Sequence, residues 1–287
     1  MGNLDTGAAR AKNGPEVTAA VLLSTYNGEQ YLSEQLDSLV AQTHKTLAIH
    51  IRDDGSADGT LDIIRDYQAR FPDIFTLYLG ANIGSSGSFC WLLENIEADM
   101  YFFCDQDDVW HADKIECHLR RYQNLLKPEM VFSDLEILEK TSGAERKTLL
   151  GLQKMNPYYL IGGVTRILCQ NPVAGCAMSL NHAAKKQILS LGQMPEKVVH
   201  DHWFAIIATL YGDVFYLPEP LVKYRLHASN QVGSQTFNFR YVVKKLINLR
   251  TTILFDLRLI RSLPKAHRPY LLRYAVVKLM ANLRRVF

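Results

Sequence analysis

Three aspartates, Asp105, Asp107 and Asp108, stand within four residues of one another. They directly follow the apolar run 100–104 (MYFFC), which predicts a buried strand. Carboxylates this close repel one another unless a cation lies between them, and Mg²⁺ or Mn²⁺ prefers such oxygen ligands. A cation at this point would also hold the oxygens of a diphosphate. The alternative is an acidic turn that caps a helix starting near Ala112.

Two other polar segments follow predicted strands. The segment DDGS at 53–56 follows the run 47–52, and its carboxylates would accept the imide N–H of uracil or thymine. The segment STYNGE at 24–29 ends the first apolar run; there Tyr26 would stack on a base and Glu29 would meet ribose hydroxyls. Each has a simpler interpretation, a turn for the first and a helix N-terminus capped by Asn27 for the second. Because ligands bind beyond the carboxyl ends of parallel strands, the three polar segments predict one binding rim.

Asp201, in the segment HDHW at 200–203, is the candidate general base, since a carboxylate can take a proton from an acceptor hydroxyl. The simpler interpretation is an acidic residue favoured at a helix N-terminus. Two histidines beside it would suit zinc, but no further histidine or cysteine has ligand spacing. Farther along, Arg225 and His227 in YRLH share one face of a strand end. Arg225 would hold a diphosphate, and His227 would hold the diphosphate or the metal.

The elements that must position these residues alternate between strand and helix, which predicts an α/β fold with a mostly parallel, Rossmann-like sheet flanked by helices. Leu32 to Val40 form an apolar stripe of helical period, and a stripe from Ile115 to Leu126 predicts another helix. Further helices are expected after 53–60, near 89–95 and near 201–210, and 139–170 is expected to be loops with one short helix. The apolar runs predict strands near residues 17–24, 47–52, 74–79, 100–104, 130–133, 174–180 and 213–217.

We expect a flexible leader (1–15) and a catalytic domain (16–238), and charge sets apart a basic amphipathic helical tail (239–287). Residues 240–287 hold 12 Lys and Arg against one acid, Asp256, whereas the first 239 residues hold 20 basic and 28 acidic residues. Such a tail suits anionic lipid headgroups; packing on the core or a homodimer interface is the alternative.

Five cysteines without CxxC spacing argue against a disulfide framework and for a reducing compartment. No signal sequence or run of 18 apolar residues is evident, and no nucleic-acid motif appears.

Taken together, STYNGE, DDGSADGT, DQDDVW, HDHW and YRLH, in this order, resemble the family-2 glycosyltransferases with the GT-A fold, over about residues 17–230. The forms DQDDVW, HDHW and YRLHASNQVG are similar to the bacterial rhamnosyltransferase-like branch, which builds surface polysaccharides. The resemblance implies an inverting transfer, with dTDP-rhamnose as the expected donor among dTDP- and UDP-sugars. It also implies a glycan or lipid-linked acceptor and a cytoplasmic enzyme at the inner membrane face.

The resemblance assigns roles by position. Asp105 would face ribose and metal, and Asp107 would be the main ligand of Mn²⁺ or Mg²⁺. Asp201 matches the catalytic aspartate, and His200 stands where most members carry glutamate. The nucleotide-binding positions match Thr25, Tyr26, Glu29 and Asp54. The acceptor side and the supporting positions match Asp108, Trp110, His200, His202 and Trp203.

Two rival functions are weaker. A nucleotidyltransferase usually has a Gly-rich phosphate loop with a basic residue after the first strand, whereas STYNGE has one glycine and no Lys or Arg. A dinucleotide dehydrogenase would need GxGxxG after a strand. A non-catalytic membrane-assembly protein on the same fold would show a broken acidic motif or lack the base, and both are intact.

Overall fold

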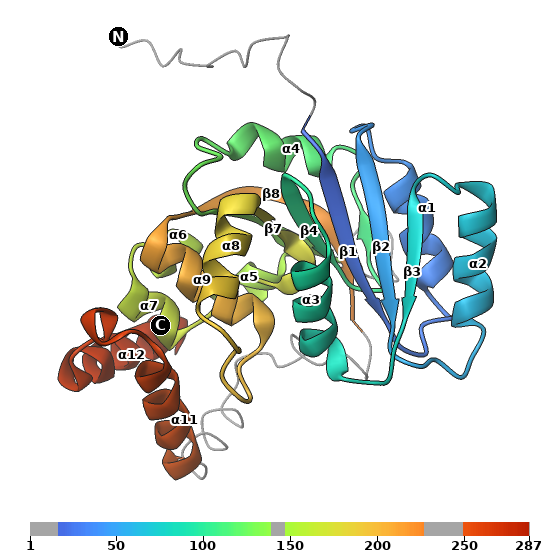
Figure 1. Ribbon diagram of the computed structural model, residues 1–287. Helices are drawn as coiled ribbons and strands as arrows, with labels where there is room; N and C mark the ends of the chain where they lie inside the picture. Colours follow the sequence, from blue (N-terminus) through green and yellow to red (C-terminus); the bar gives the residue numbers. More distant parts are fainter. Residues whose placement is uncertain (1–16, 139–146, 227–248, 287) are drawn as a thin grey trace, which may run out of the picture.

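The computed structural model describes residues 17–138, 147–226 and 249–286. Its centre is one eight-stranded sheet with the strand order β3-β2-β1-β4-β7-β6-β8-β5 (Figure 1). Four pairings are parallel and three are antiparallel, so the sheet is mixed. The strands are β1 Ala19–Thr25, β2 Leu47–Asp53, β3 Phe75–Leu79, β4 Met100–Cys104, β5 Val109–Trp110, β6 Glu129–Leu138, β7 Met178–Asn181 and β8 Asp213–Arg225.

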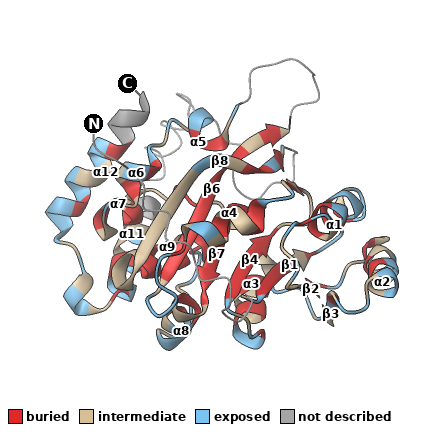
Figure 2. Ribbon diagram, turned by 90° about the horizontal axis from the view of Figure 1, so that it is seen from above, coloured by how far each residue is buried: buried red, intermediate tan, exposed pale blue. Residues whose placement is uncertain are grey.

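Helices cover both faces of the sheet (Figures 1 and 2). One apolar core joins α3, α8 and α9 to one face, and a second joins α1, α2 and α4 to the other. The predicted α/β class is therefore confirmed. The helices are α1 Leu32–Val40, α2 Thr60–Arg70, α3 Gly84–Asn95, α4 Lys114–Arg121, α5 Leu149–Leu152, α6 Pro157–Leu160, α7 Val164–Cys169, α8 His182–Ser190, α9 His200–Tyr211, α11 Leu249–Ser262 and α12 Leu271–Val286, with 3-10 turns η1 Gly175–Ala177 and η2 Lys265–His267.

The strands closest to the site behave as their apolar runs predict. All five residues of β4 are buried, because helices cover both sides of the strand. β1 pairs in parallel with β2 and with β4, and β2 pairs in parallel with β3. The carboxyl ends of β1, β2 and β4 therefore lie side by side, which brings the three predicted polar loops to one edge.

Several boundaries differ from the prediction. α3 begins at Gly84, whereas the helix was expected only near 89–95, so the Gly/Ser segment before it forms the first turns. α4 ends at Arg121, and Leu126, predicted on its buried stripe, is 93% exposed. β5 and α8 were not predicted, and the expected single helix in 139–170 is three short ones within the described residues.

β8 continues to Arg225, well beyond the predicted end at 217. Pro218 and Pro220 lie within it, although proline cannot donate to a sheet ladder. The structure accommodates them where the pairing with β6 changes register, between Ser133 and Leu135. A bulge of this kind leaves a residue unpaired, so the missing N–H groups cost little. The longer strand carries Tyr224 to the pocket described below.

The described part of the basic tail is helical. Leu259 and Ile260 of α11, Leu263 just after it and Tyr274 of α12 are buried in the core shared with α3 and α9, and α12 packs against α7. Among the described residues, no helix is both long and apolar enough to cross a bilayer. The predicted leader and the segment 227–248 lie outside the described residues.

Candidate active site

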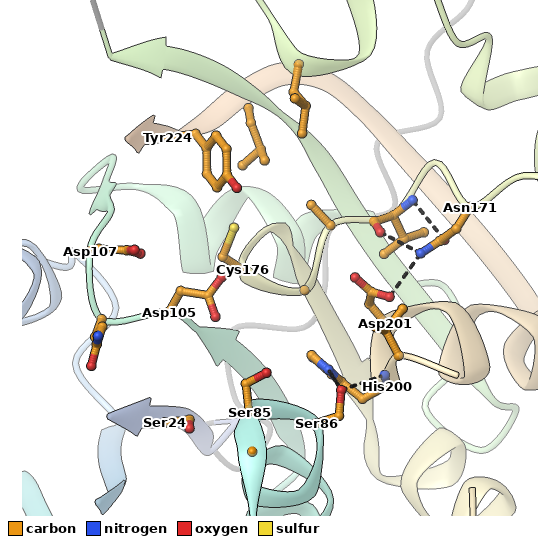
Figure 3. A pocket seen from close by; sticks show the side chains of 18 of the residues that line it. Ser24, Ser85, Ser86, Asp105, Asp107, Asn171, Cys176, His200, Asp201 and Tyr224 are labelled. Atoms are coloured by element: carbon orange, nitrogen blue, oxygen red, sulfur yellow. Dashed lines mark hydrogen bonds between the residues drawn. The ribbon is translucent and has the colours of Figure 1, made fainter. Parts of the chain in front are cut away.

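A pocket of about 590 Å³ opens at the carboxyl ends of β1, β2 and β4. This is where open α/β sheets bind ligands. Its walls also include the first turns of α3 and α9 and the end of β8. Figure 3 shows Asp105 and Asp201 entering it from opposite sides. The candidate residues that line it are Tyr26, Asp54, Asp105, Asp107, His200 and Asp201.

The acidic loop begins where β4 ends. Asp105 and Asp107 both line the pocket, while Asp108 is fully buried beneath them. Asp108 Oδ1 accepts a hydrogen bond of 3.2 Å from the backbone N–H of Arg225. Its other oxygen, Oδ2, is buried without a hydrogen-bond partner. The nearby Cys176 thiol is a weak donor that lowers the pKa of Asp108, so it supplies part of what this buried carboxylate needs.

Asp105, Asp108 and Cys176 each place one ligand atom within 4.8 Å of the others. Burial, followed by the charges of neighbouring aspartates, raises the pKa of Asp105 well above its ordinary value and that of Asp108 to about 7. A cation would relieve both effects. Burial also raises the pKa of the Cys176 thiol well above its ordinary value, so it stays protonated and is a poor ligand for a hard cation. The residues present therefore fit a divalent cation held by carboxylates.

Asp201, in the first turn of α9, is 9% exposed and faces this acidic loop across the pocket (Figure 3). Burial raises the pKa of its carboxyl group to about 7. A carboxylate with that pKa accepts a proton more readily near neutral pH than an ordinary aspartate does. Asn171, which the sequence did not single out, donates a hydrogen bond of 3.0 Å from Nδ2 to Asp201 Oδ1.

His200 packs among aromatic rings beside the pocket. Its ring centroid is 4.5 Å from that of Phe89 and 5.8 Å from that of Phe103. Burial lowers its pKa to about 3, so the imidazole is neutral. Nδ1 lies 3.3 Å from Ser86 Oγ, at the start of α3. His200 therefore joins α9 to α3 as an uncharged side chain.

Besides Asp108, three residues expected on the acceptor or supporting side do not line the pocket. His202 Nε2 lies 2.7 Å from the carbonyl oxygen of Ile167, on the far side of α9. Trp203 is 3% exposed and belongs to the apolar core. Trp110 is buried against Phe102, with ring centroids 6.3 Å apart.

Asp54 lines the pocket, but its carboxylate is already well supplied with donors. Oδ1 accepts a hydrogen bond of 2.6 Å from Ser88 Oγ and pairs with the guanidinium of Arg52. Oδ2 accepts a hydrogen bond of 3.1 Å from the N–H of Ile83. Asp54 thus orders the segment leading into α3. That segment places Asn82, Gly84, Ser85 and Ser86 along the pocket.

Of the other three residues expected to contact the nucleotide, one lines the pocket and two do not. Tyr26 is 49% exposed on the pocket rim, which leaves its ring available for stacking. Thr25 donates to Asp53 Oδ2 at 2.9 Å and does not line the pocket. Glu29 Oε2 accepts from the N–H of Gly59 at 2.6 Å and also lies outside it.

Gln106, between the acidic residues, links two of the predicted loops. Its Oε1 accepts from the N–H of Tyr26 at 2.9 Å, and its Nε2 donates to the carbonyl oxygen of Tyr26 at 3.1 Å. This pair of bonds fixes the acidic loop against the loop after β1. The sequence offered no local signal for it, because the two positions are 80 residues apart.

Arg225 braces the acidic loop from outside the pocket. Its Nε donates to the carbonyl oxygen of Asp107 at 3.0 Å, and its guanidinium pairs with Glu34 and lies 4.5 Å from the ring centroid of Tyr31. Its place outside the pocket does not match the expected contact with a diphosphate. His227, the other residue expected from YRLH, lies outside the described residues.

Comparisons with known proteins point to one family. The sequence model described as glycosyl transferase family 2 matches residues 20–181. A dTDP-rhamnosyl transferase, RfbG of Shigella flexneri, is 28% identical over 239 residues, covering 78% of each protein. An uncharacterized glycosyltransferase of Nostoc sp. is 26% identical over 216 residues, which are 74% of this chain but only 65% of that protein.

Among solved structures, the mannosyltransferase PcManGT of Pyrobaculum calidifontis, determined in complex with GDP-Man and Mn²⁺, superposes with a TM-score of 0.60. The alignment covers 94% of this chain and 72% of that one at 16% sequence identity. At that identity the likeness shows a shared fold.

Proposed function

The chain belongs to glycosyl transferase family 2, and from that premise we propose that it transfers a sugar from a nucleotide sugar to an acceptor hydroxyl with inversion. The observation that carries the proposal is the pairing of Asp105 and Asp201 across one pocket. One carboxylate group suits the diphosphate side of the donor, and the other suits the acceptor side.

In the proposed reaction, Asp201 takes the proton of the acceptor hydroxyl while the oxygen of that hydroxyl attacks the anomeric carbon. The new C–O bond forms as the bond from that carbon to the diphosphate oxygen breaks, and the electron pair leaves with the nucleoside diphosphate. A single displacement from the opposite face inverts the configuration. A base with a pKa raised to about 7 suits this proton transfer near neutral pH.

We assign the cation side to Asp105 with Asp107 or Asp108, which would hold Mn²⁺ or Mg²⁺. When bound, such an ion neutralises the charge that develops on the diphosphate leaving group. Tyr26 would stack on the base at the rim. Gln106 and Arg225 hold the acidic loop in place for this role.

For the donor we propose dTDP-rhamnose, in the synthesis of a surface polysaccharide. The support is the name of the Shigella relative and the motif forms DQDDVW and HDHW. A thermal-shift screen of dTDP-, UDP- and GDP-sugars with Mn²⁺ tests it. The dTDP-sugar should raise the unfolding temperature most, and a preference for GDP-sugars would overturn the assignment.

We also propose that the enzyme works on a glycan or lipid-linked acceptor at an anionic membrane surface, with α12 lying on the lipid. One side of α12 packs on the protein through Tyr274 and Ala281. The opposite side is exposed and apolar from Leu271 to Met280. That side consists of Leu271, Leu272, Ala275, Val276, Leu279 and Met280.

The exposed charges in the described part of the tail have one sign. Asp256, the one acid of the tail, forms an ion pair with Lys278, so it does not offset the surrounding cations. Each cation near an anionic surface contributes on the order of 1 kcal/mol. An exposed apolar helix face bordered by cations is typical of interfacial helices. The exposed cations described are Arg258, Arg261, Lys265, Arg268 and Arg273.

A further inference from the structure

Asn171 is joined to the candidate base by its side-chain amide (Figure 3). It lies between α7 and η1, and its Nδ2 donates to Asp201 Oδ1 at 3.0 Å. The same Nδ2 donates to the carbonyl oxygen of Val173 at 2.9 Å. Asn171 Oδ1 in turn accepts from the N–H of Val173 at 3.1 Å. Every polar atom of this amide is therefore engaged.

These contacts fix which way the amide faces. A backbone N–H can only donate, so the atom opposite the N–H of Val173 must be the amide oxygen. The NH₂ group is then directed at Asp201. Pro172 restricts the backbone of Asn171, and Val173 is buried, so the loop cannot readily turn the amide away.

We propose that Asn171 is a positioning residue, which holds the carboxylate of Asp201 in the rotamer that serves the acceptor hydroxyl. The inference rests on the proposed function, because it needs Asp201 to be the base. The amide engages one carboxylate oxygen, and Figure 3 shows the other directed toward the side of the pocket that carries Asp105. A tied carboxylate keeps one reactive oxygen aligned, whereas an untied one would sample several rotamers.

Alternative side chains at position 171 lack the required chemistry. Leucine has a similar size but no donor, so Asp201 would keep only the backbone N–H groups of His202 and Gly175 as donors. Aspartate would place a second carboxylate at hydrogen-bond distance, where like charges repel. Glutamine keeps the amide but moves it by one methylene, so the bonds to Val173 and Asp201 cannot both keep their geometry.

The test compares Asn171→Leu with wild type in the full-length protein. We expect kcat to fall roughly 10- to 100-fold, the scale set by small misplacements of a catalytic group, while the KM for the donor stays near wild type. The matched control is Asn95→Leu, because Asn95 also donates to a backbone carbonyl, that of Trp91, but does not line the pocket. Unchanged kcat in Asn171→Leu would overturn the proposal.

A double-variant comparison separates positioning from a general structural effect. In an Asp201→Asn background, Asn171→Leu should lower the residual turnover no further, because no base is left to orient. An equal loss in both backgrounds would overturn the proposal. If Asn171→Leu does not fold, Asn171→Gln serves instead: reduced kcat with a near-native unfolding temperature supports the inference, and full kcat refutes it. Full activity in the single variant Asp201→Asn would refute the proposed base itself. Full kcat in Asn171→Leu together with loss of turnover in Asp201→Asn would refute only the role of Asn171.

Discussion

Lys114 Nζ donates a hydrogen bond of 2.7 Å to the backbone carbonyl of Cys176, so the helix behind the acidic loop is tied to the turn that faces Asp105. The lysine is fully buried, and Nζ lies 3.2 Å from the ring centroid of Trp110. Burial lowers its pKa to about 7. Lys114 is thus a buried amino group that interacts with a group of carboxylates, including Asp105 and Asp108.

We predict that Lys114→Met lowers stability. Methionine fills much of the space but leaves the carbonyl of Cys176 without its donor, a loss of about 1–3 kcal/mol. Chemical denaturation measures the difference. Lys186→Met is the control, because Lys186 is exposed on α8 and its replacement should change stability by less than about 0.5 kcal/mol. Equal stability of Lys114→Met and wild type would show that desolvation of the lysine offsets its hydrogen bond.

Metal addition should stabilise the wild type through Asp105. An ion that binds only the folded state, at about 100 times its Kd, adds about 2.7 kcal/mol to stability. Asp105→Asn should lose the rise in unfolding temperature caused by Mn²⁺ and the metal-dependent binding of the donor. Asp113→Asn, an exposed carboxylate outside the pocket, should keep both.

Asp107→Ala and Asp108→Asn then identify the second ligand. The variant that removes the second ligand should lose the rise in unfolding temperature caused by Mn²⁺, while its fold stays intact. A full response in Asp105→Asn would contradict the assignment of the cation to this loop.

The raised pKa of Asp201 predicts two pH effects. The base must be deprotonated, so kcat/KM should rise with pH around an apparent pKa of about 7. The folded state also keeps a proton that the unfolded state releases above its ordinary pKa of 3.8, so this group's stabilising contribution is lost as pH rises through about 7. Asp201→Asn should therefore gain stability relative to wild type at about pH 8 and not at about pH 4. It should bind donor normally and lose roughly 10²- to 10⁴-fold in turnover.

Thermal unfolding at the two pH values and a pH–rate profile check these effects. Retained turnover in Asp201→Asn would rule out the base. A flat pH profile between about pH 6 and 8 would show that another group takes the proton.

The exposed side of α12 should carry the membrane contact. Burying a leucine contributes about 1.5–3 kcal/mol, so Leu272→Glu with Leu279→Glu should weaken binding to phosphatidylglycerol vesicles by roughly 100-fold or more. Leu126→Glu is the matched control, since Leu126 is 93% exposed but lies on the body of the protein. Co-sedimentation measures binding, with phosphatidylcholine vesicles as the neutral comparison.

The variant with Leu272→Glu and Leu279→Glu also tests the alternative, in which a second copy of the chain covers this face of α12. If α12 forms a homodimer instead, light scattering should show the mass halve in the variant while vesicle binding stays unchanged, and that result would contradict the membrane proposal. Point changes are preferable to deleting the tail, because Leu259 and Ile260 of α11 belong to the core.

The sequence predicted those parts of the fold whose cause is local. The run 100–104 is continuously apolar because β4 is covered on both faces, and polar residues after it lie at the sheet edge because parallel strands end there. The start of α3 was missed because glycine and serine are poor helix formers, and here Asp54 orders that segment through Ile83 and Ser88.

The contacts that support the site residues could not be predicted from the sequence, for a different reason. Asn171 and Asp201 are 30 residues apart, and Lys114 and Cys176 are 62 apart. Periodic patterns relate residues within one helix or strand, and neither pair lies within one element. Only the folded chain therefore brings the two members of each pair together. The pattern Asn-Pro at 171–172 signals a turn but not what the amide contacts.

The bidentate grip of Gln106 on Tyr26 has a consequence for redesigning the enzyme. One side chain couples the loop expected to read the base with the loop expected to grip the phosphates, so neither can be exchanged as an independent module. A chimaera that imports the β1 loop of a relative to change nucleotide preference would have to import the residue at position 106 as well.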